Sequence, residues 1–201
     1  MRSTWVVIPG QAFDRGKTRL AAVLSAGERR QFSRACLSHV VRTARRVVPP
    51  RRIVVVSRAA EVLGLARRLG VMAQRESGGG LNKAVAQGSR YAAARGASAV
   101  IALHGDLPAV SVQDVRMMVA VLDRNPGVVL APDEAGEGSN ALGMRPPGKI
   151  AYRFGAGSFG RHRAEARRRR ARLRIVRSPG LARDVDTPEN YRQFRNTKQK
   201  R

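Results

Sequence analysis

Cysteine and aromatic residues are scarce in this chain, and each scarcity argues against a class of protein. The one cysteine, Cys36, can form no internal disulfide bond and lies among apolar residues at helical spacing, which favours a packed thiol. Aromatic residues make up 4% of the 201 residues, so few rings are available to stack on bases. No zinc-finger spacing or aromatic RNA-binding cluster is present. A disulfide-stabilised secreted domain and the common nucleic-acid modules are therefore disfavoured.

Long apolar runs are also missing. A membrane-spanning helix needs about 18 or more consecutive apolar residues, and no stretch approaches that length. The chain starts Met1-Arg2-Ser3-Thr4-Trp5 and runs directly into an apolar segment, without the layout of a signal peptide. Together with the presence of a single cysteine, these features predict a cytoplasmic protein with no membrane partner.

Acidic residues are few, since 14 Asp and Glu stand against 39 Lys and Arg and give a formal net charge of +25. Such an excess is typical of nucleic-acid binders, because Lys and Arg supply much of the affinity for phosphate backbones. The densest basic run, Arg161 to Arg174, has the pattern of a helix followed by a strand. A solvated helix face is the simpler explanation of this run, and nucleic-acid binding stays an alternative hypothesis.

Apolar residues, at 43% of the chain, are sufficient for one full core at this length. We predict a single domain over residues 1–195 and a basic, disordered tail over residues 196–201. Apolar runs predict strands at 5–9, 52–57, 71–74, 99–103, 128–131 and 173–176, and helical patterns fall at 28–47, 60–69, 81–95, 112–122 and 188–194. Uniformly apolar strands that alternate with helices indicate an α/β fold with a mostly parallel sheet covered on both faces.

Regular structure is expected to stop between Asp133 and Pro147. This stretch is rich in glycine and too long for a plain connection, so we interpret it as a functional loop.

Three aspartates follow predicted strands, where open α/β sheets bind their ligands. They are Asp106 in a Gly-Asp-Leu-Pro segment and the pair Asp184 and Asp186. Side chains two residues apart in an extended segment leave the same face. Because Mg²⁺ takes few protein carboxylates and completes its shell with phosphate oxygens, the three aspartates are candidate Mg²⁺ ligands. Alternatively, Asp184 is a turn residue and Asp186 caps the helix that begins near Thr187-Pro188.

The loop after the first strand offers cations for a phosphate. Gly16 can take positive φ, and Lys17 and Arg19 can set two positive charges against a polyphosphate. Gly16-Lys17-Thr18 is similar to the end of a phosphate-binding Walker A loop, but the earlier glycine of that motif is absent, so we reject that interpretation. A solvated basic turn is the alternative.

Two glycine-containing segments are further candidates. Gly78-Gly79-Gly80-Leu81-Asn82 opens a helix, where free N–H groups favour anions and bare backbone lets a base approach, although a flexible linker has the same composition. Ser139, Asn140 and Ser158 offer neutral donors for a phosphate or carboxylate, and Ser158 comes just before a helix predicted from Phe159.

The histidines carry less information. His162 either assists the donors near Ser158 or lies at the surface. His104 has no Ser or Cys nucleophile pattern beside it, so we assign it no catalytic role, and His39 is predicted to be structural.

The order of these motifs resembles that of the CofC/FbiD guanylyltransferases, over residues 5 to 194. The matching motifs, in chain order, are Val7-Ile8-Pro9, Gly16-Lys17-Thr18-Arg19-Leu20, Gly80-Leu81-Asn82, Gly105-Asp106-Leu107-Pro108, Ala131-Pro132-Asp133, Gly138-Ser139-Asn140-Ala141-Leu142, Phe154-Gly155-Ala156-Gly157-Ser158-Phe159 and Asp184-Val185-Asp186-Thr187-Pro188. Two positions depart from the family pattern, because Gln11 stands where a lysine is usual and Gly105 where alanine is common.

The resemblance implies a MobA-like (glycosyltransferase-A-type) nucleotidyltransferase fold. It implies transfer of GMP from GTP to a small phosphorylated carboxylic acid, with release of pyrophosphate, in the biosynthesis of coenzyme F420. The acceptor would be phosphoenolpyruvate, 3-phospho-D-glycerate or 2-phospho-L-lactate, and the arginine-rich composition favours the first two. The resemblance also allows a homodimer.

Carried over by motif, the resemblance gives each candidate residue a role. Asp106, Asp184 and Asp186 would hold Mg²⁺, with Lys17 and Asp106 catalytic and Arg19 on phosphate. Gly80, Leu81 and Asn82 would face the guanosine, and Asn140, Gly155 and Ser158 would cradle the acceptor. A related enzyme with another acceptor, such as a molybdopterin, is the nearest alternative, but Ile8-Pro9-Gly10 replaces the Leu-Ala-Gly-Gly opening of such enzymes.

Overall fold

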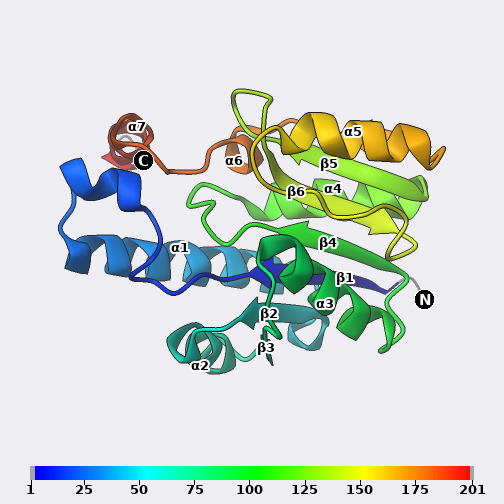
Figure 1. Ribbon diagram of the computed structural model, residues 1–201, viewed down its shortest axis with the longest axis horizontal. Helices are drawn as coiled ribbons and strands as arrows, with labels where there is room; N and C mark the ends of the chain where they lie inside the picture. Colours follow the sequence, from blue (N-terminus) through cyan, green and yellow to red (C-terminus); the bar gives the residue numbers. More distant parts are fainter. Residues whose placement is uncertain (1–2, 200–201) are drawn as a thin grey trace.

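Seven strands form one sheet in the order β3-β2-β1-β4-β6-β5-β7 in the computed structural model, which describes residues 3–199 (Figure 1). The strands are β1 (Thr4–Pro9), β2 (Ile53–Ser57), β3 (Met72–Arg75), β4 (Ala99–Leu103), β5 (Gly127–Pro132), β6 (Ser139–Arg145) and β7 (Leu173–Ile175). All neighbouring strands pair in parallel except β6, which is antiparallel to both β4 and β5. The predicted α/β fold with a mostly parallel sheet is confirmed.

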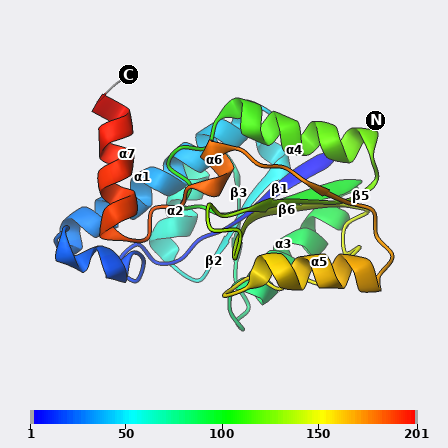
Figure 2. The ribbon, with the colours of Figure 1, turned by 90° about the horizontal axis from the view of Figure 1, so that it is seen from above.

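Helices cover both faces of this sheet, as Figure 2 shows from above. One face carries α1 (Ala26–Arg45), α2 (Ala60–Arg68) and α4 (Val112–Arg124), and the other carries α3 (Leu81–Ala93) and α5 (Ser158–Arg168). Side chains alternate along β1, so Val6 and Ile8 pack in the core beneath α1, α2 and α4, whereas Trp5 and Val7 pack against α3. Every residue of β2 and β4 is buried, which is why their sequences are apolar on both faces.

Strand β6 lies inside the segment that we predicted to be an irregular loop, so that prediction is wrong. Its sequence mixes small and polar residues and lacks the β-branched character of the other strands. Its small residues are required by packing, since a Cβ atom at Gly143 would lie 2.6 Å from Cγ1 of Val129 and 2.8 Å from Cδ1 of Leu122. Because residues of β6 must be small to fit against large neighbouring side chains, the strand lacks the run of large apolar residues from which strands are predicted.

The C-terminal segment crosses the carboxyl ends of the strands. It contains the short helix α6 (Pro179–Ala182) and ends in α7 (Pro188–Gln199), which packs on the 3-10 turn η1 (Thr18–Ala22), while a second such turn, η2 (Pro50–Arg52), precedes β2. Tyr191 and Phe194 of α7 place their rings 5.3 and 5.8 Å from that of Phe32 in α1. The predicted tail at 196–201 is therefore corrected, because no helix breaker follows Pro188 and α7 continues to Gln199. Residues 200–201 lie outside the described residues, and the domain boundary at 195 stays a prediction.

Within residues 3–199, no helix is both long enough and apolar enough to cross a membrane. The cytoplasmic location stays a prediction.

Gly127 provides a test of the packing between β5 and β7. Its φ is +150°, and a Cβ atom would lie 2.3 Å from the carbonyl oxygen of Arg172. We expect Gly127→Ala to lower the free energy of unfolding by about 3 kcal/mol or more, because backbone strain and overlap with a main-chain atom add. Gly136→Ala is the matched control, since its φ is +73° and its Cβ would meet nothing within 4 Å, so it should cost only about 1–2 kcal/mol. Equal losses in urea unfolding of the two variants would contradict the prediction.

Candidate active site

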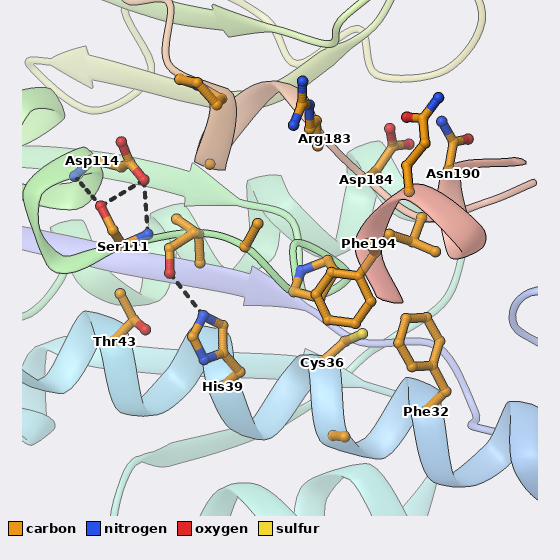
Figure 3. Close-up of a pocket in the computed structure, with 18 of the residues that line it drawn as sticks. Phe32, Cys36, His39, Thr43, Ser111, Asp114, Arg183, Asp184, Asn190 and Phe194 are labelled. Carbon is orange, nitrogen blue, oxygen red and sulfur yellow. Dashed lines mark hydrogen bonds between the residues drawn. The ribbon is translucent and has the colours of Figure 1, made fainter. Parts of the chain in front are cut away.

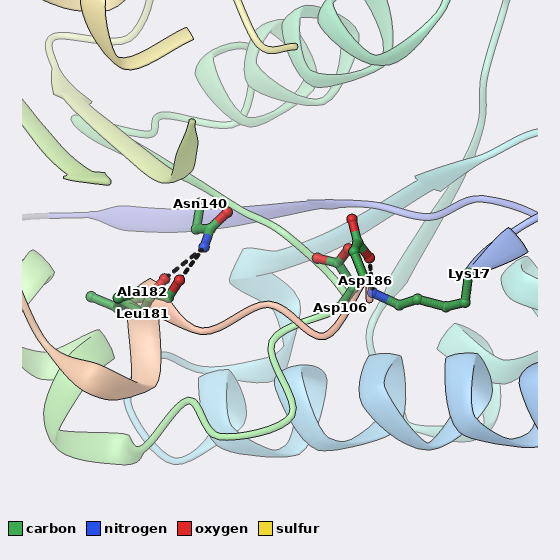
Figure 4. Close-up of polar contacts among 6 residues, drawn as sticks. All are labelled: Lys17, Asp106, Asn140, Leu181, Ala182 and Asp186. Carbon is green, nitrogen blue, oxygen red and sulfur yellow. Dashed lines mark hydrogen bonds and ion pairs between the residues drawn. The ribbon is translucent and has the colours of Figure 1, made fainter. Parts of the chain in front are cut away.

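Lys17, Asp106 and Asp186 meet at the carboxyl edge of the sheet (Figure 4). Lys17 precedes η1 in the left-handed conformation (φ 59°), Asp106 follows β4, and Asp186 lies between α6 and α7. The Nζ atom of Lys17 donates to Oδ2 of Asp106 at 3.1 Å and to Oδ1 of Asp186 at 2.6 Å. Only 4% of the Lys17 side chain is exposed, against 37% and 47% for the two aspartates. An ammonium group is thus held between two carboxylates that remain partly open to solvent.

The charged groups of this cluster shift the pKa values of their neighbours. Burial alone would lower the pKa of Lys17, but attraction to Asp106 and Asp186 raises it above its ordinary value, so Lys17 stays cationic. Burial alone would raise the pKa of Asp106, but Lys17 lowers it, and the net direction is down. Burial, with repulsion from Asp106 and Asp186, raises the pKa of Asp184 to about 6. The cluster therefore presents a fixed positive charge beside at least two ionised carboxylates.

The carboxylates fit a divalent cation as a pair rather than as a ready-made triad. Among residues 3–199, no group of three or more His, Cys, Asp or Glu side chains is close enough to hold a metal ion. The reason is that uncompensated carboxylates repel, and Lys17 takes the place between Asp106 and Asp186. Oδ1 of Asp106 is buried and accepts no hydrogen bond from another described residue, which leaves a hard oxygen for a cation. One or two carboxylates with substrate phosphates suit Mg²⁺ well.

The segment 183–187 carries the other two predicted metal ligands, Asp184 and Asp186. Its structure tests the alternative in which Asp186 caps α7. The N–H of Asn190 donates to Oγ1 of Thr187 at 3.2 Å, so Thr187 caps the first turn of α7. Asp186 is therefore free to bind Lys17, and its interpretation as the cap of α7 is wrong.

Asp184 is partly buried and also lines a cavity of about 1160 Å³ on the side of α1 (Figure 3). This cavity lies between α1, the start of α4, and helices α6 and α7, and its lining does not include Lys17, Asp106 or Asp186. Ser111 and Asp114 on its wall bind each other in a capping box. The cavity therefore lies beside the Lys17–Asp106–Asp186 cluster and not at it, and Asp184 borders both.

Asn140, a predicted acceptor contact, binds the segment that leads to Asp186. Its side-chain nitrogen donates to the carbonyl oxygens of Leu181 and Ala182 at 3.0 and 3.1 Å (Figure 4). These carbonyls belong to the last residues of α6, where a helix has no internal donors left. Asn140 is 4% exposed, so the bonds are shielded from water.

Asn82, a predicted guanosine contact, joins α3 to the segment before α5. Its Nδ2 donates to the carbonyl of Phe154 at 3.1 Å, and its Oδ1 accepts from the N–H of Phe154 at 2.7 Å. Gly80 and Leu81 are exposed at the start of α3, and Gly155 is exposed directly after Phe154. Ser158 is buried as the first residue of α5. Arg19 is exposed on η1, and the substrate contacts of all these residues stay predictions.

Phe154 had no assigned role from the sequence, although it lies at the centre of this side of the site. Its ring centroid lies 4.9 Å from that of His104 and 4.9 Å from that of His162. An isolated large apolar residue within a glycine-rich segment was the available signal.

Of the three histidines, His162 is buried, whereas His39 and His104 are partly buried. Burial lowers the pKa of His104 and so favours the neutral imidazole. His162 is fully buried, so its interpretation as a surface residue is wrong. Its Nε2 accepts from the N–H of Arg153 at 2.9 Å, which places the proton on Nδ1, 3.0 Å from the Ser139 hydroxyl. His39 is structural as predicted, since its Nε2 lies 2.7 Å from the carbonyl oxygen of Val110.

His162 predicts an acid-sensitive fold. Burial and then the charge of Arg161 lower its pKa from 6.5 to about 4, so below pH 6.5 the unfolded chain takes up the proton first and stability falls as the pH falls. From about pH 7 to about pH 5 the loss should be about 2 kcal/mol. His162→Gln should lose that much less in urea unfolding over the same range. The raised pKa of Asp184 makes the stability rise as the pH falls, which is the opposite direction. This contribution is the same in the wild type and in the variant, so it drops out of the comparison. Equal pH dependence of both would contradict this assignment.

Solved structures identify the class to which this fold belongs. A nucleotidyl transferase from a Methanothermobacter species superposes with a TM-score of 0.70 at 16% identity, over 100% of this chain and 99% of that one. A Mycobacterium tuberculosis protein solved in complex with manganese gives a TM-score of 0.57 at 17% identity, over 96% and 98%. At these identities the likeness defines the fold alone, which is the MobA-like nucleotidyltransferase fold that we predicted.

The sequence itself places the chain more closely. Residues 4–194 match the family described as "Guanylyl transferase CofC like", and the chain belongs to this family of nucleotidyltransferases. A protein of Rubrobacter xylanophilus named phosphoenolpyruvate guanylyltransferase is 41% identical over 188 residues, which cover 94% of this chain and 91% of that protein.

Proposed function

We propose that this protein transfers GMP from GTP to the phosphate of phosphoenolpyruvate, with Mg²⁺ and with release of pyrophosphate, as a step in coenzyme F420 biosynthesis. The observation that carries the proposal is the Lys17 ammonium held between Asp106 and Asp186 at the carboxyl edge of the sheet. Membership of the guanylyl transferase family and the name of the relative at 41% identity support the nucleotide and the acceptor.

The acceptor needs no general base. The second pKa of a phosphate monoester is about 6, so near neutral pH a phosphate oxygen is already a nucleophile. That oxygen attacks the α-phosphorus of GTP, the bond from the α-phosphorus to the bridging oxygen breaks, and pyrophosphate leaves with the bonding pair. Catalysis then consists of alignment and neutralisation of charge.

The residues of the site divide this work. Lys17 stays positively charged and would neutralise negative charge on the triphosphate during the attack. Asp106 and Asp186, with Asp184 beside them, would hold Mg²⁺, which would neutralise charge on the phosphates. Gly155 and Ser158, which flank the start of α5, would line the site of the anionic acceptor, and the start of α3 would face the guanosine.

The direct test is pyrophosphate release from GTP and Mg²⁺ with each of the three phospho-acids. We expect release with phosphoenolpyruvate to be about tenfold faster or more than with 3-phospho-D-glycerate or 2-phospho-L-lactate, because these acids differ by small groups that a site discriminates modestly. ATP and CTP in place of GTP are the nucleotide controls.

Two results would overturn the proposal. Faster release with another of the three acids would replace the acceptor but keep the nucleotide chemistry. Silence with all three acids would reject the reaction itself, and salt-sensitive binding to random oligonucleotides would then favour the nucleic-acid alternative.

A further inference from the structure

Both polar atoms of the Asn82 side chain bind the backbone of a distant segment. It accepts from the N–H of Phe154 at 2.7 Å and donates to the carbonyl of Phe154 at 3.1 Å, across 72 positions of sequence. This pair of bonds resembles the pair that two residues exchange between antiparallel β-strands, and it uses both the oxygen and the nitrogen of the amide. A residue placed at the start of α3 is thus attached to the segment that leads into α5.

Phe154 makes this attachment rigid on the other side. It is 5% exposed, and its ring packs between the imidazoles of His104, which follows β4, and His162, which lies on α5. The neighbouring N–H of Arg153 binds Nε2 of His162. Gly155, which follows Phe154, has a φ of +117° and is exposed, so the chain turns toward solvent immediately after the attached residue.

A second amide on the same helix fixes the other segment next to α3. Oε1 of Gln87 accepts from the N–H of Ser77 at 2.9 Å, and its Nε2 donates to the carbonyl of Arg75 at 2.8 Å. Ser77 lies three residues before Gly80, the first of the residues assigned above to the guanosine. Helix α3 therefore holds two different segments by the same kind of bond, one through Gln87 and one through Asn82.

We infer that Asn82 is a positioning residue for the acceptor segment 153–158, which it attaches to the start of α3. The inference rests on the proposed function for the identity of the two substrates. Asn82 then acts on the phospho-acid through Phe154 and Gly155 rather than by touching the guanosine. Its loss frees a segment that ends at Ser158, the first residue of α5 and one of the residues proposed for the acceptor site.

Asn82→Asp and Gln87→Glu form a matched pair of variants. Each keeps the oxygen that accepts from a backbone N–H, removes one donor to a backbone carbonyl, and adds one negative charge to α3. Asn82→Ala removes the amide without adding charge. We expect both Asn82 variants to raise KM for phosphoenolpyruvate about tenfold or more and to leave KM for GTP nearly unchanged, because each loses contacts of the acceptor segment. Gln87→Glu should raise KM for GTP instead.

Hydrogen exchange provides a measurement that does not depend on activity. In Asn82→Ala, the amide of Phe154 should exchange about tenfold faster or more than in the wild type, since local opening no longer breaks a hydrogen bond. In Gln87→Glu its exchange should stay at the wild-type rate. Circular dichroism establishes that each variant is folded.

The outcomes separate this inference from the proposed function. A wild-type protein that is silent with all acceptors, but whose Asn82→Ala variant shows faster exchange only over residues 153–158, would remove the proposed function and keep the attachment. Unchanged exchange at Phe154 in Asn82→Ala would overturn the inference. A higher KM for GTP with an unchanged KM for phosphoenolpyruvate would also overturn it and would make Asn82 a nucleotide contact.

Discussion

Asp106→Asn and Asp186→Asn are each expected to lower the turnover of GTP by about a hundredfold to a thousandfold, with the fold retained. Asparagine has nearly the same shape as aspartate, but it carries no charge for Lys17 or for a divalent cation. In either variant Lys17 keeps the other carboxylate as a partner, so no buried charge is left alone. Steady-state pyrophosphate release and urea unfolding measure the two parts of this expectation.

Asp14→Asn is the control for the change of charge. Asp14 is exposed in the same loop as Lys17, and the variant loses one carboxylate without touching the cluster. Its turnover should remain within about twofold of the wild type. Near wild-type turnover in Asp106→Asn or Asp186→Asn would remove that residue from the reaction, and an equal loss in Asp14→Asn would mean that net charge, and not position, governs the rate.

Lys17 and Asp106 could be predicted because each follows a strand with a strong local signal. Asp106 comes three residues after the end of the uniformly apolar β4, and the parallel sheet brings the carboxyl ends of such strands to one edge. Lys17 was predicted through its glycine neighbour and its place after β1. What the sequence could not provide is their pairing, since the contact between Lys17 and Asp186 spans 169 positions.

Strand β6 and helix α6 were not predicted from the sequence, for two different reasons. Strand β6 has small residues because Val129 and Leu122 leave no space at Gly143. Helix α6 has four residues, too few for a periodic pattern. The asparagines were predicted to meet substrate because amides can donate and accept, but Asn82 and Asn140 direct their amides at backbone groups. Which partner an amide finds depends on tertiary structure, and spacing carries no information about it.

Asn140→Asp is expected to be the most damaging change of a single side-chain group outside the charged cluster. The two bonds from Asn140 to Leu181 and Ala182 hold the end of α6, and Asp186 follows four residues after Ala182. In the variant, a carboxylate would face two carbonyl oxygens in a buried place, so it both loses the donors and adds repulsion. We expect the free energy of unfolding to fall by about 3 kcal/mol or more, against about 1–3 kcal/mol for Asn140→Ala.

The same change should reach the reaction, because a small displacement of the segment that carries Asp186 misplaces a group on which transfer depends. A misplacement of about 1 Å can cost about a hundredfold in rate, and we expect losses of about tenfold to a hundredfold in both Asn140 variants. Binding of Mn²⁺ in the presence of GTP, followed by electron paramagnetic resonance, should weaken in parallel, which a loss of stability alone would not produce below the unfolding transition. Asn125→Asp makes the same chemical change at the end of α4, just before the amino end of β5 and so at the opposite edge of the sheet from the cluster, and it should leave Mn²⁺ binding unchanged. Unaltered Mn²⁺ binding in Asn140→Asp, with turnover reduced, would instead place the Asn140 side chain on the acceptor, as its motif implied.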